Sequence, residues 1–206
     1  MEQAVWLFTG GEGPADATLL SDLPKAVQVY AADSGLDLAR SLGYIVDLAV
    51  GDFDSIADTT LLTTIRYEQH CRDKDETDTE LLLKIMKDRS LPYVLIGGGG
   101  RRFDHLLHLY SLFSTYGAPR IWITARETLY LVEATAVFEL EHETPCSILP
   151  AYSDGTSYVN SRNLEWELND YAIHMKSMSI SNRVKTSPIS LNVKGCPVFF
   201  SIIRNP

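Results

Sequence analysis

Acidic residues follow short apolar runs at two places early in this 206-residue chain. Residues 51–56, GDFDSI, come directly after the apolar run 48–50, and Asp33 ends another such run. Asp52 and Asp54 are two residues apart, so an extended backbone would point both side chains the same way. Carboxylates that lie close together repel each other unless a cation neutralises them. The pattern therefore predicts a magnesium-phosphate site.

A further acidic segment, DKDETD at residues 73–78, leads into a predicted helix. Thr77 and Glu80 have the spacing of a capping box, which marks the first turn of a helix. Backbone N–H groups and the positive dipole end at such a turn favour bound phosphate. Magnesium prefers one or two carboxylates together with phosphate oxygens and water. The predicted magnesium ligands are Asp52, Asp54 and Asp78, with Asp75 as a second choice.

Each acid also has a simpler explanation. A single Asp after a strand is typically a turn former or a helix cap, and Asp33 fits that role. Asp78 equally fits a first-turn charge that stabilises its own helix. The pair in GDFDS is harder to explain by capping, because a cap at residue 54 or 55 leaves Asp52 without that role.

A glycine run at residues 97–100 matches neither the P-loop pattern nor GxGxxG, so alone it indicates only a permissive turn. Arg102 and Asp104 follow it closely, and a guanidinium group beside a glycine loop suits a phosphate. His105 and His108 are expected to be helix-surface or packing residues, because magnesium has little affinity for imidazole.

Short apolar runs alternate with helical patterns in the first half of the chain. The predicted strands are residues 5–8, 27–32, 48–52 and 93–96, and the predicted helices end near Gly43, open at Thr77, and run from Phe103 to about Gly117. The residues expected on buried helix faces are Leu38, Ala39 and Leu42; Leu81, Leu82, Ile85 and Met86; and Phe103, Leu106, Leu107, Tyr110 and Phe113. This alternation predicts a Rossmann-like three-layer α/β fold, with a mostly parallel sheet and flanking helices. Ligands bind beyond the carboxyl ends of such strands, where the acids and the glycine run should meet.

Helical periodicity disappears after about Arg126. Short alternating segments follow at residues 129–132, 137–140, 173–175, 189–193 and 198–203, separated by turn residues. This pattern is typical of a smaller antiparallel all-β domain, a sandwich or a barrel. The predicted domains are residues 1–126 and 127–206.

Composition excludes several classes of protein. The chain has 18 Lys and Arg against 27 Asp and Glu, a net charge of −9, so it lacks the basic footprint of a nucleic-acid binder. Its three cysteines show no CxxC spacing and predict reduced thiols in a cytoplasmic protein. No apolar stretch approaches the length of a transmembrane helix, so no membrane partner is expected.

The ordered set of motifs resembles the thiamine pyrophosphokinase family. GDFDS, the DKDxTD-type segment, the glycine loop ending in R-x-D-H, and a late LEWEL…SISN pair occur in family order between Asp33 and Asn182. The resemblance implies Mg²⁺-dependent transfer of pyrophosphate from ATP to the hydroxyl of thiamine, giving thiamine diphosphate and AMP. It also implies an ATP-binding catalytic domain at 1–126, a thiamine-binding and dimerisation domain at 127–206, and a homodimer with the thiamine site at its interface.

The resemblance also implies roles for individual residues. Asp52, Asp54 and Asp78 would hold magnesium on the phosphates of ATP. The implied nucleotide and reaction residues are Asp33, Lys74, Asp75, Thr77, Gly99, Gly100, Arg102 and Asp104. The implied thiamine residues are Ser161, Trp166, Ser181 and Asn182. Asp104 or Asp75 could take the hydroxyl proton, and the sequence does not choose between them.

The chain departs from the family pattern at three positions. Ser34 and Arg101 stand where the family has glycine, and Arg101 either crowds the phosphate loop or adds a phosphate contact. Asn163 replaces a glycine before residues 164–166, and Asn tolerates a positive φ better than most residues. Two rival functions remain open: a related phosphotransferase acting on another alcohol, and a catalytically silent binding protein. Trp166 and the pair at 181–182 favour thiamine, and retention of every acid favours an enzyme.

Overall fold

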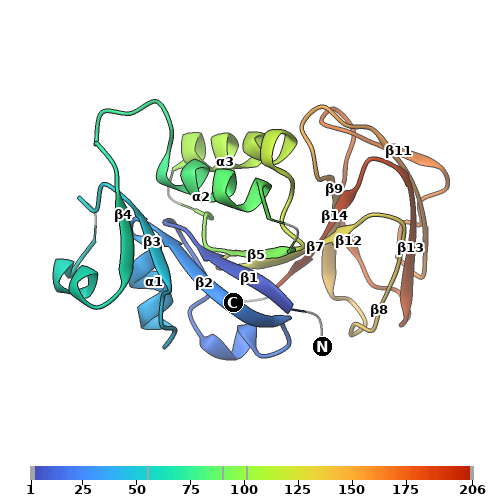
Figure 1. Cartoon of the computed structure of the whole chain (residues 1–206). Coiled ribbons are helices and arrows are strands. Elements are labelled where there is room, and N and C mark those ends of the chain that lie inside the picture. Colours follow the sequence, from blue (N-terminus) through green and yellow to red (C-terminus); the bar gives the residue numbers. More distant parts are fainter. Residues whose placement is uncertain (1–2, 55, 90, 101, 205–206) are drawn as a thin grey trace. The chain divides into compact units, whose positions relative to one another are not determined.

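The chain folds as two compact units (Figure 1). The computed structural model describes residues 3–54, 56–89, 91–100 and 102–204. The first unit comprises Met1–Leu112 and Pro119–Ala125, and the second comprises Phe113–Ala118 and Arg126–Pro206. Among the described residues, no helix combines the length and the hydropathy needed to cross a membrane.

Parallel strands form the centre of the first unit. Their order across the sheet, among the described residues, is β6-β5-β1-β2-β3-β4. Their bounds are β1 Gln3–Phe8, β2 Lys25–Ala32, β3 Leu48–Gly51, β4 Arg66–Gln69, β5 Tyr93–Ile96 and β6 Ile121–Ile123. The chain builds outward from β1 to β4 and then returns to the other side of β1, so the strand order reverses between β1 and β5. Ligands of open α/β sheets bind at such a switch point.

Helices cover both faces of this sheet. In Figure 1, α2 (Asp78–Lys87) and α3 (Phe103–Tyr116) lie above it and α1 (Gly35–Ser41) lies below it. Short 3₁₀ helices occupy Ala17–Leu20 and Thr59–Thr63. At the end of α1, Gly43 has a φ of 82°, and its N–H donates to the carbonyl of Arg40 at 2.9 Å. This is the glycine stop that the sequence predicted. The predicted cap of α2 is also present, because the Thr77 side chain accepts from the Glu80 N–H at 3.2 Å.

The predicted buried faces of two helices were partly wrong. On α2, Leu82, Leu83 and Met86 are buried, whereas Leu81 and Ile85 are only half-buried. On α3, the buried side chains are Leu109, Leu112 and Phe113, whereas Phe103 is 75% exposed and Leu107 is 50% exposed. Apolar residues extend around much of each helix, so a period of 3.6 fits more than one face, and only packing decides between them.

The second unit contains two antiparallel sheets. The described strands are β7 Glu127–Val132, β8 Thr135–Phe138, β9 Pro145–Pro150, β10 Ser157–Arg162, β11 Tyr171–Ile173, β12 Ser179–Arg183, β13 Ile189–Gly195 and β14 Val198–Ile203. Within this unit the strands pair in the orders β12-β9-β14-β7 and β11-β10-β13-β8. Buried side chains of both sheets form one core, in which the rings of Phe138 and Phe200 lie 4.7 Å apart. The predicted fold class, an α/β unit with a smaller all-β sandwich, is confirmed.

Two glycine-rich loops pair with each other at the switch point. The loop after β1 and the loop after β5 exchange backbone hydrogen bonds: the Glu12 N–H donates to the Gly99 carbonyl at 2.7 Å, and the Gly98 N–H donates to the Gly10 carbonyl at 2.9 Å. Gly97 has a φ of 101°, and a Cβ added there would lie 2.3 Å from the Thr9 carbonyl oxygen. Glycine at position 97 therefore allows the two main chains to approach this closely.

Gly97→Ala should destabilise the fold more than Gly43→Ala does. Both positions have a positive φ, but a Cβ at Gly43 meets nothing within 4 Å. The strained conformation alone should cost about 1 kcal/mol at Gly43, and the added clash should raise the cost at Gly97 to about 3 kcal/mol or more. Urea unfolding of the two variants measures both values. Equal losses would mean that the loops have room to separate.

Candidate active site

A cavity of about 440 Å³ opens at the carboxyl ends of the parallel strands. Loops that follow β1, β2, β3 and β5 line it, together with the first turns of α2 and α3. The lining residues are 9–11, 32–34, 77–79 and 98–100, with Asp52, Arg72, Lys74, Arg102, His105, His108 and Leu109. The cavity therefore lies where the strand order reverses, as expected for a ligand site of this fold.

Three carboxylates converge at this edge of the sheet. Asp33, Asp52 and Asp54 each offer one oxygen, and these atoms all lie within 4.8 Å of one another. Asp33 follows β2 while the other two follow β3, and neighbouring parallel strands end at the same edge. A Cβ added at Gly51 would lie 3.3 Å from the Asp33 backbone, so glycine lets the two strand ends approach. The group has the spacing and the hard oxygen donors that suit a divalent cation such as Mg²⁺.

Asp52 and Asp54 meet for a different reason than the one predicted. The backbone between them is not extended, because Phe53 has a φ of 61°. A bulky side chain rarely adopts this conformation. Burial holds it there: Phe53 is 6% exposed, and its ring contacts Tyr67 of β4 edge-on, with centroids 5.8 Å apart. The Asp54 N–H then donates to Asp52 Oδ1 at 3.1 Å, which closes a tight turn.

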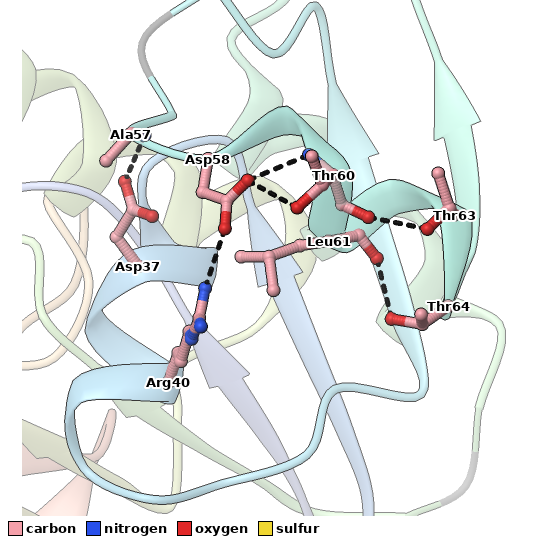
Figure 2. A network of polar contacts seen from close by, with 8 residues as sticks. All are labelled: Asp37, Arg40, Ala57, Asp58, Thr60, Leu61, Thr63 and Thr64. Atoms are coloured by element: carbon pink, nitrogen blue, oxygen red, sulfur yellow. Dashed lines mark hydrogen bonds and ion pairs between the residues drawn. The ribbon is translucent and has the colours of Figure 1, made fainter.

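Helix α1 anchors the segment that follows Asp54 (Figure 2). Asp37 accepts a hydrogen bond from the Ala57 N–H at 2.9 Å, and Arg40 donates to Asp58 at 3.1 Å. Asp58 also accepts from the Thr60 N–H and hydroxyl, and these hydrogen bonds lower its pKa. Because α1 begins directly after Asp33, one helix ties the acid that precedes it to the loop that carries the other two.

Lys74 lies between two of the acids. Its Nζ is 3.0 Å from Asp78 Oδ1 and 3.9 Å from Asp52 Oδ2, and it donates to the Cys71 carbonyl at 3.1 Å. The Lys74 side chain is only 13% exposed, and the Asp52 and Asp78 side chains are 15% and 19% exposed. Lys74 Nζ and Asp78 Oδ1 do not have the angles of a hydrogen bond, so their 3.0 Å contact is an ion pair. Asp78, predicted as a metal ligand, is thus the closest partner of Lys74.

The glycine run uses its N–H groups within the fold. The N–H groups of Gly97, Gly98 and Gly99 donate to the carbonyls of Ile123, Gly10 and Glu12. Gly99 and Gly100 line the cavity, but the N–H groups of Gly97, Gly98 and Gly99 are already hydrogen-bonded within the fold and do not form a phosphate cradle. Positive charge at the cavity comes instead from Lys74, Arg72 and Arg102 and from the first turn of α2.

Arg102 and Asp104 form an exposed ion pair beside the cavity. Their side chains make two hydrogen bonds, at 3.2 and 2.5 Å, and each is 64% exposed. The hydrogen bonds from Arg102 lower the pKa of Asp104 to about 2. Arg102 lines the cavity, whereas Asp104 and the exposed Asp75 are not among its described lining residues. Arg101 lies outside the described residues.

Sequence reasoning missed several residues of the cavity wall. Arg72 directly precedes the DKDETD segment, and its guanidinium lies 3.2 Å from Asp54. Thr9 and Thr79 share a hydroxyl–hydroxyl hydrogen bond that joins the loop after β1 to the first turn of α2. His108 lines the cavity and lies 3.6 Å from Glu80. Arg72, Thr9 and Thr79 belong to no motif that a pattern could single out, whereas His105 and His108, expected to be helix-surface or packing residues, both line the cavity.

The predicted thiamine residues divide into an exposed and a buried pair. Trp166 is 57% exposed, and Ser181 is exposed with a φ of 57°. Ser161 and Asn182 are each 2% exposed. The Ser161 hydroxyl accepts from the Leu168 N–H at 2.8 Å, so it holds the loop that carries Trp166.

Asn182 grips the main chain of Trp166. Its Oδ1 accepts from the Trp166 N–H at 3.2 Å, and its Nδ2 donates to the Trp166 carbonyl at 2.8 Å. The guanidinium of Arg183 lies 5.3 Å from the centre of the Trp166 ring. Asn163, at the start of the loop, has a φ of 69°, and its carbonyl accepts from the Lys185 N–H at 2.9 Å. The turn expected there is present with Asn in place of glycine.

The fold matches solved thiamin pyrophosphokinases. The enzyme from Bacillus subtilis superposes with a TM-score of 0.77 at 20% identity over 100% of both chains. The Candida albicans enzyme gives a TM-score of 0.75 at 17% identity, over 99% of this chain and 90% of the other. A family protein from Enterococcus faecalis gives 0.77 at 18% identity, over 98% of this chain and all of the other. At such identities these likenesses establish the fold.

Two family profiles match most of the sequence itself. The profile of the thiamin pyrophosphokinase catalytic domain matches residues 21–124, and that of the thiamin pyrophosphokinase vitamin B1 binding domain matches residues 136–195. No curated protein sequence matches significantly. The catalytic profile covers the acids, Lys74 and Arg102, and the vitamin B1 profile covers Trp166 and Asn182. The chain therefore belongs to the thiamin pyrophosphokinase family, ATP-dependent transferases that pass pyrophosphate to thiamine.

Proposed function

We propose that the cavity of the first unit binds ATP together with Mg²⁺ and that the second unit binds thiamine. The observation that carries the proposal is the convergence of Asp33, Asp52 and Asp54 within 4.8 Å at the edge of a parallel sheet. Such a group of like charges destabilises the folded protein unless a cation neutralises it. An acidic cluster beside cationic side chains suits a metal-bound nucleotide, because the metal neutralises the acids while the cations meet the phosphates.

The residues present fit a magnesium site. Asp33, Asp52 and Asp54 would hold the ion, with phosphate oxygens and water completing its shell. When bound, Mg²⁺ supplies neutralisation of the charge on the phosphate oxygens. Asp78 would join these ligands only where the ion displaces Lys74, whose Nζ lies 3.0 Å from it.

Cations around the cavity would bind the phosphates. Lys74, Arg72 and Arg102 line the cavity, and the first turn of α2 adds the N–H groups of residues 78 and 79 near its mouth. Arg102 offers a planar guanidinium suited to two phosphate oxygens at once. Binding phosphate there would require Arg102 to exchange its present partner, Asp104.

In the reaction, the hydroxyl oxygen of thiamine attacks the β-phosphorus of ATP. A new O–P bond forms, the bond from the β-phosphorus to the oxygen of the α-phosphate breaks, and AMP leaves. While Arg102 remains its partner, Asp104 has a pKa of about 2 and is a weak proton acceptor, and Asp75 is exposed. Phosphoryl transfer depends mainly on positioning and charge neutralisation. The acids and cations of the cavity supply both, so a strong base is not essential to the step.

We further propose that residues 127–206 bind thiamine and form a homodimer, while residues 1–126 bind ATP and carry out catalysis. Trp166 supports this proposal because an exposed indole face suits a cationic heteroaromatic substrate. In a symmetric dimer, Trp166 of one subunit would complete the site on the acidic loops of the other. The three cysteines carry no disulfide, which supports a reducing, cytoplasmic location.

Incubation with ATP, Mg²⁺ and thiamine should yield AMP and thiamine diphosphate in equal amounts. Transfer of a pyrophosphoryl group releases AMP, whereas an ordinary kinase releases ADP. Anion-exchange chromatography separates the two nucleotides. ADP as the sole thiamine-dependent product would reject pyrophosphoryl transfer and leave the fold unaffected.

Asp54→Asn should lower turnover by at least about a hundredfold, the scale of losing one strong electrostatic contact in a transition state. The amide keeps the size of the side chain but removes a charge that a divalent cation needs. Asp88→Asn is the matched control, because Asp88 is an exposed acid at the opposite end of α2 from the cavity. The control should keep its activity. Normal turnover of Asp54→Asn would mean that this acid only shapes the turn.

Mixing Trp166→Ala with Asp54→Asn should restore activity if the site is shared across a dimer. Each mutant homodimer has two damaged sites, but a mixed dimer carries both lesions in one site and leaves the other intact. Random exchange should restore up to about a quarter of wild-type activity. Differently tagged subunits verify the exchange by co-purification. Verified exchange without rescue would assign Trp166 to the site or core of its own subunit.

A further inference from the structure

Lys74 is a mostly buried cation that sits among acids. Its ammonium group lies 3.0 Å from Asp78 and 3.9 Å from Asp52, and its side chain is only 13% exposed. Holding a long lysine side chain at such a position costs conformational entropy and hydration. The two acids repay that cost, because without Lys74 they would face each other and the neighbouring carboxylates with little water to screen them.

Asp52 belongs to two groups at once. It is 3.9 Å from Lys74, and it is also one of the three acids whose oxygens lie within 4.8 Å of one another. A divalent cation held by Asp52 would therefore bind close to an ammonium group. Two positive charges a few ångströms apart in a poorly hydrated site repel strongly. The cation and Lys74 thus compete for the same carboxylate.

We propose that Lys74 is an exchangeable counter-ion of the acidic cluster. In the metal-free protein its ammonium group neutralises Asp52 and Asp78, and binding of a divalent cation displaces it. Lys74 lines the cavity, so the displaced ammonium group remains within reach of a ligand there. It would then meet the phosphates that arrive with the metal. One residue would in this way stabilise the empty site and afterwards position the nucleotide.

The proposal rests on the metal site proposed above. It predicts that loss of the Lys74 charge strengthens the binding of a divalent cation and weakens the binding of ATP. Lys74→Met removes the competing charge, so the variant should bind Mn²⁺ alone at least about tenfold more tightly than wild type does. The same variant should bind ATP more weakly, because a phosphate contact is lost. Electron paramagnetic resonance of free Mn²⁺ measures the first affinity without any turnover. Calorimetry with Mg²⁺ and a non-hydrolysable ATP analogue measures the second.

Arg72→Gln is the matched control. It removes one positive charge from the same cluster, since Arg72 lies 3.2 Å from Asp54, but the Arg72 side chain is 80% exposed. Water screens an exposed pair, so the affinity for Mn²⁺ should rise by less than about threefold. The difference in Mn²⁺ affinity between the two variants distinguishes removal of a specific competitor from the general effect of removing a positive charge.

Thermal unfolding provides a second measurement. Without metal, Lys74→Met should unfold at least about 4 °C below wild type, because paired acids are left uncompensated. Saturating Mg²⁺ should recover most of that loss, since the metal supplies the missing charge. If Lys74→Met fails to fold even with Mg²⁺, Lys74→Gln keeps more of the polarity and length of the side chain and is used for both measurements.

The outcomes separate this inference from the proposed function. Tighter Mn²⁺ binding by the Lys74 variant than by the Arg72 variant supports the exchange. Unchanged or weaker Mn²⁺ binding, with wild type binding normally, overturns it and makes Lys74 a fixed part of the fold. Absence of Mn²⁺ binding by wild type would instead reject the metal site itself, and the exchange would be rejected with it.

Discussion

Repulsion among carboxylates at one edge of a sheet is the constraint on which the first unit depends. Neighbouring parallel strands end together, so the acids after β2 and β3 cannot avoid each other. Two uncharged, buried residues hold the acids together. Gly51 lets the strand ends approach, and the packing of the Phe53 ring stabilises a strained turn. Lys74 then offsets part of the charge from inside. Packing therefore maintains the arrangement of the acids against their electrostatic repulsion.

Much of the fold follows from the sequence because apolar runs and caps are local signals. The central strands, the glycine stop at Gly43 and the cap at Thr77 were all predicted. The strands that were not predicted have weak patterns of their own. Strand β4 is a polar sheet edge, and β6 has three residues. Strand β9 begins and ends with proline, β12 is mostly polar, and β10 buries Ser157 and Ser161 where a strand pattern requires apolar side chains. These strands depend on pairing with neighbours that are distant in sequence, which a local pattern does not contain.

The site was predictable only in part. Motif order singled out the acids and the loop that carries Trp166, but whether each residue faces a ligand or the protein depends on contacts between loops. Asp33, which the sequence pattern explains as a turn former, lies in the group of three acids, whereas Asp78 forms an ion pair with Lys74. Gly99, which the family resemblance assigned to the nucleotide, donates its N–H to the loop after β1, as Gly98 also does. Each of these outcomes results from two segments far apart in sequence lying side by side.

The hydrogen bonds of Asn182 to the loop that carries Trp166 fix the main-chain path of that loop independently of the side chain at position 166. Asn182 forms hydrogen bonds with the N–H and the carbonyl of residue 166, groups that every amino acid except proline supplies. These hydrogen bonds would keep the main chain on the same path with any residue except proline at position 166. Under the proposed role of Trp166, a change of acceptor alcohol during evolution would need a new side chain at this position and no new path for the loop. This loop of the second unit can therefore carry different aromatic or polar side chains at position 166 on the same main-chain path.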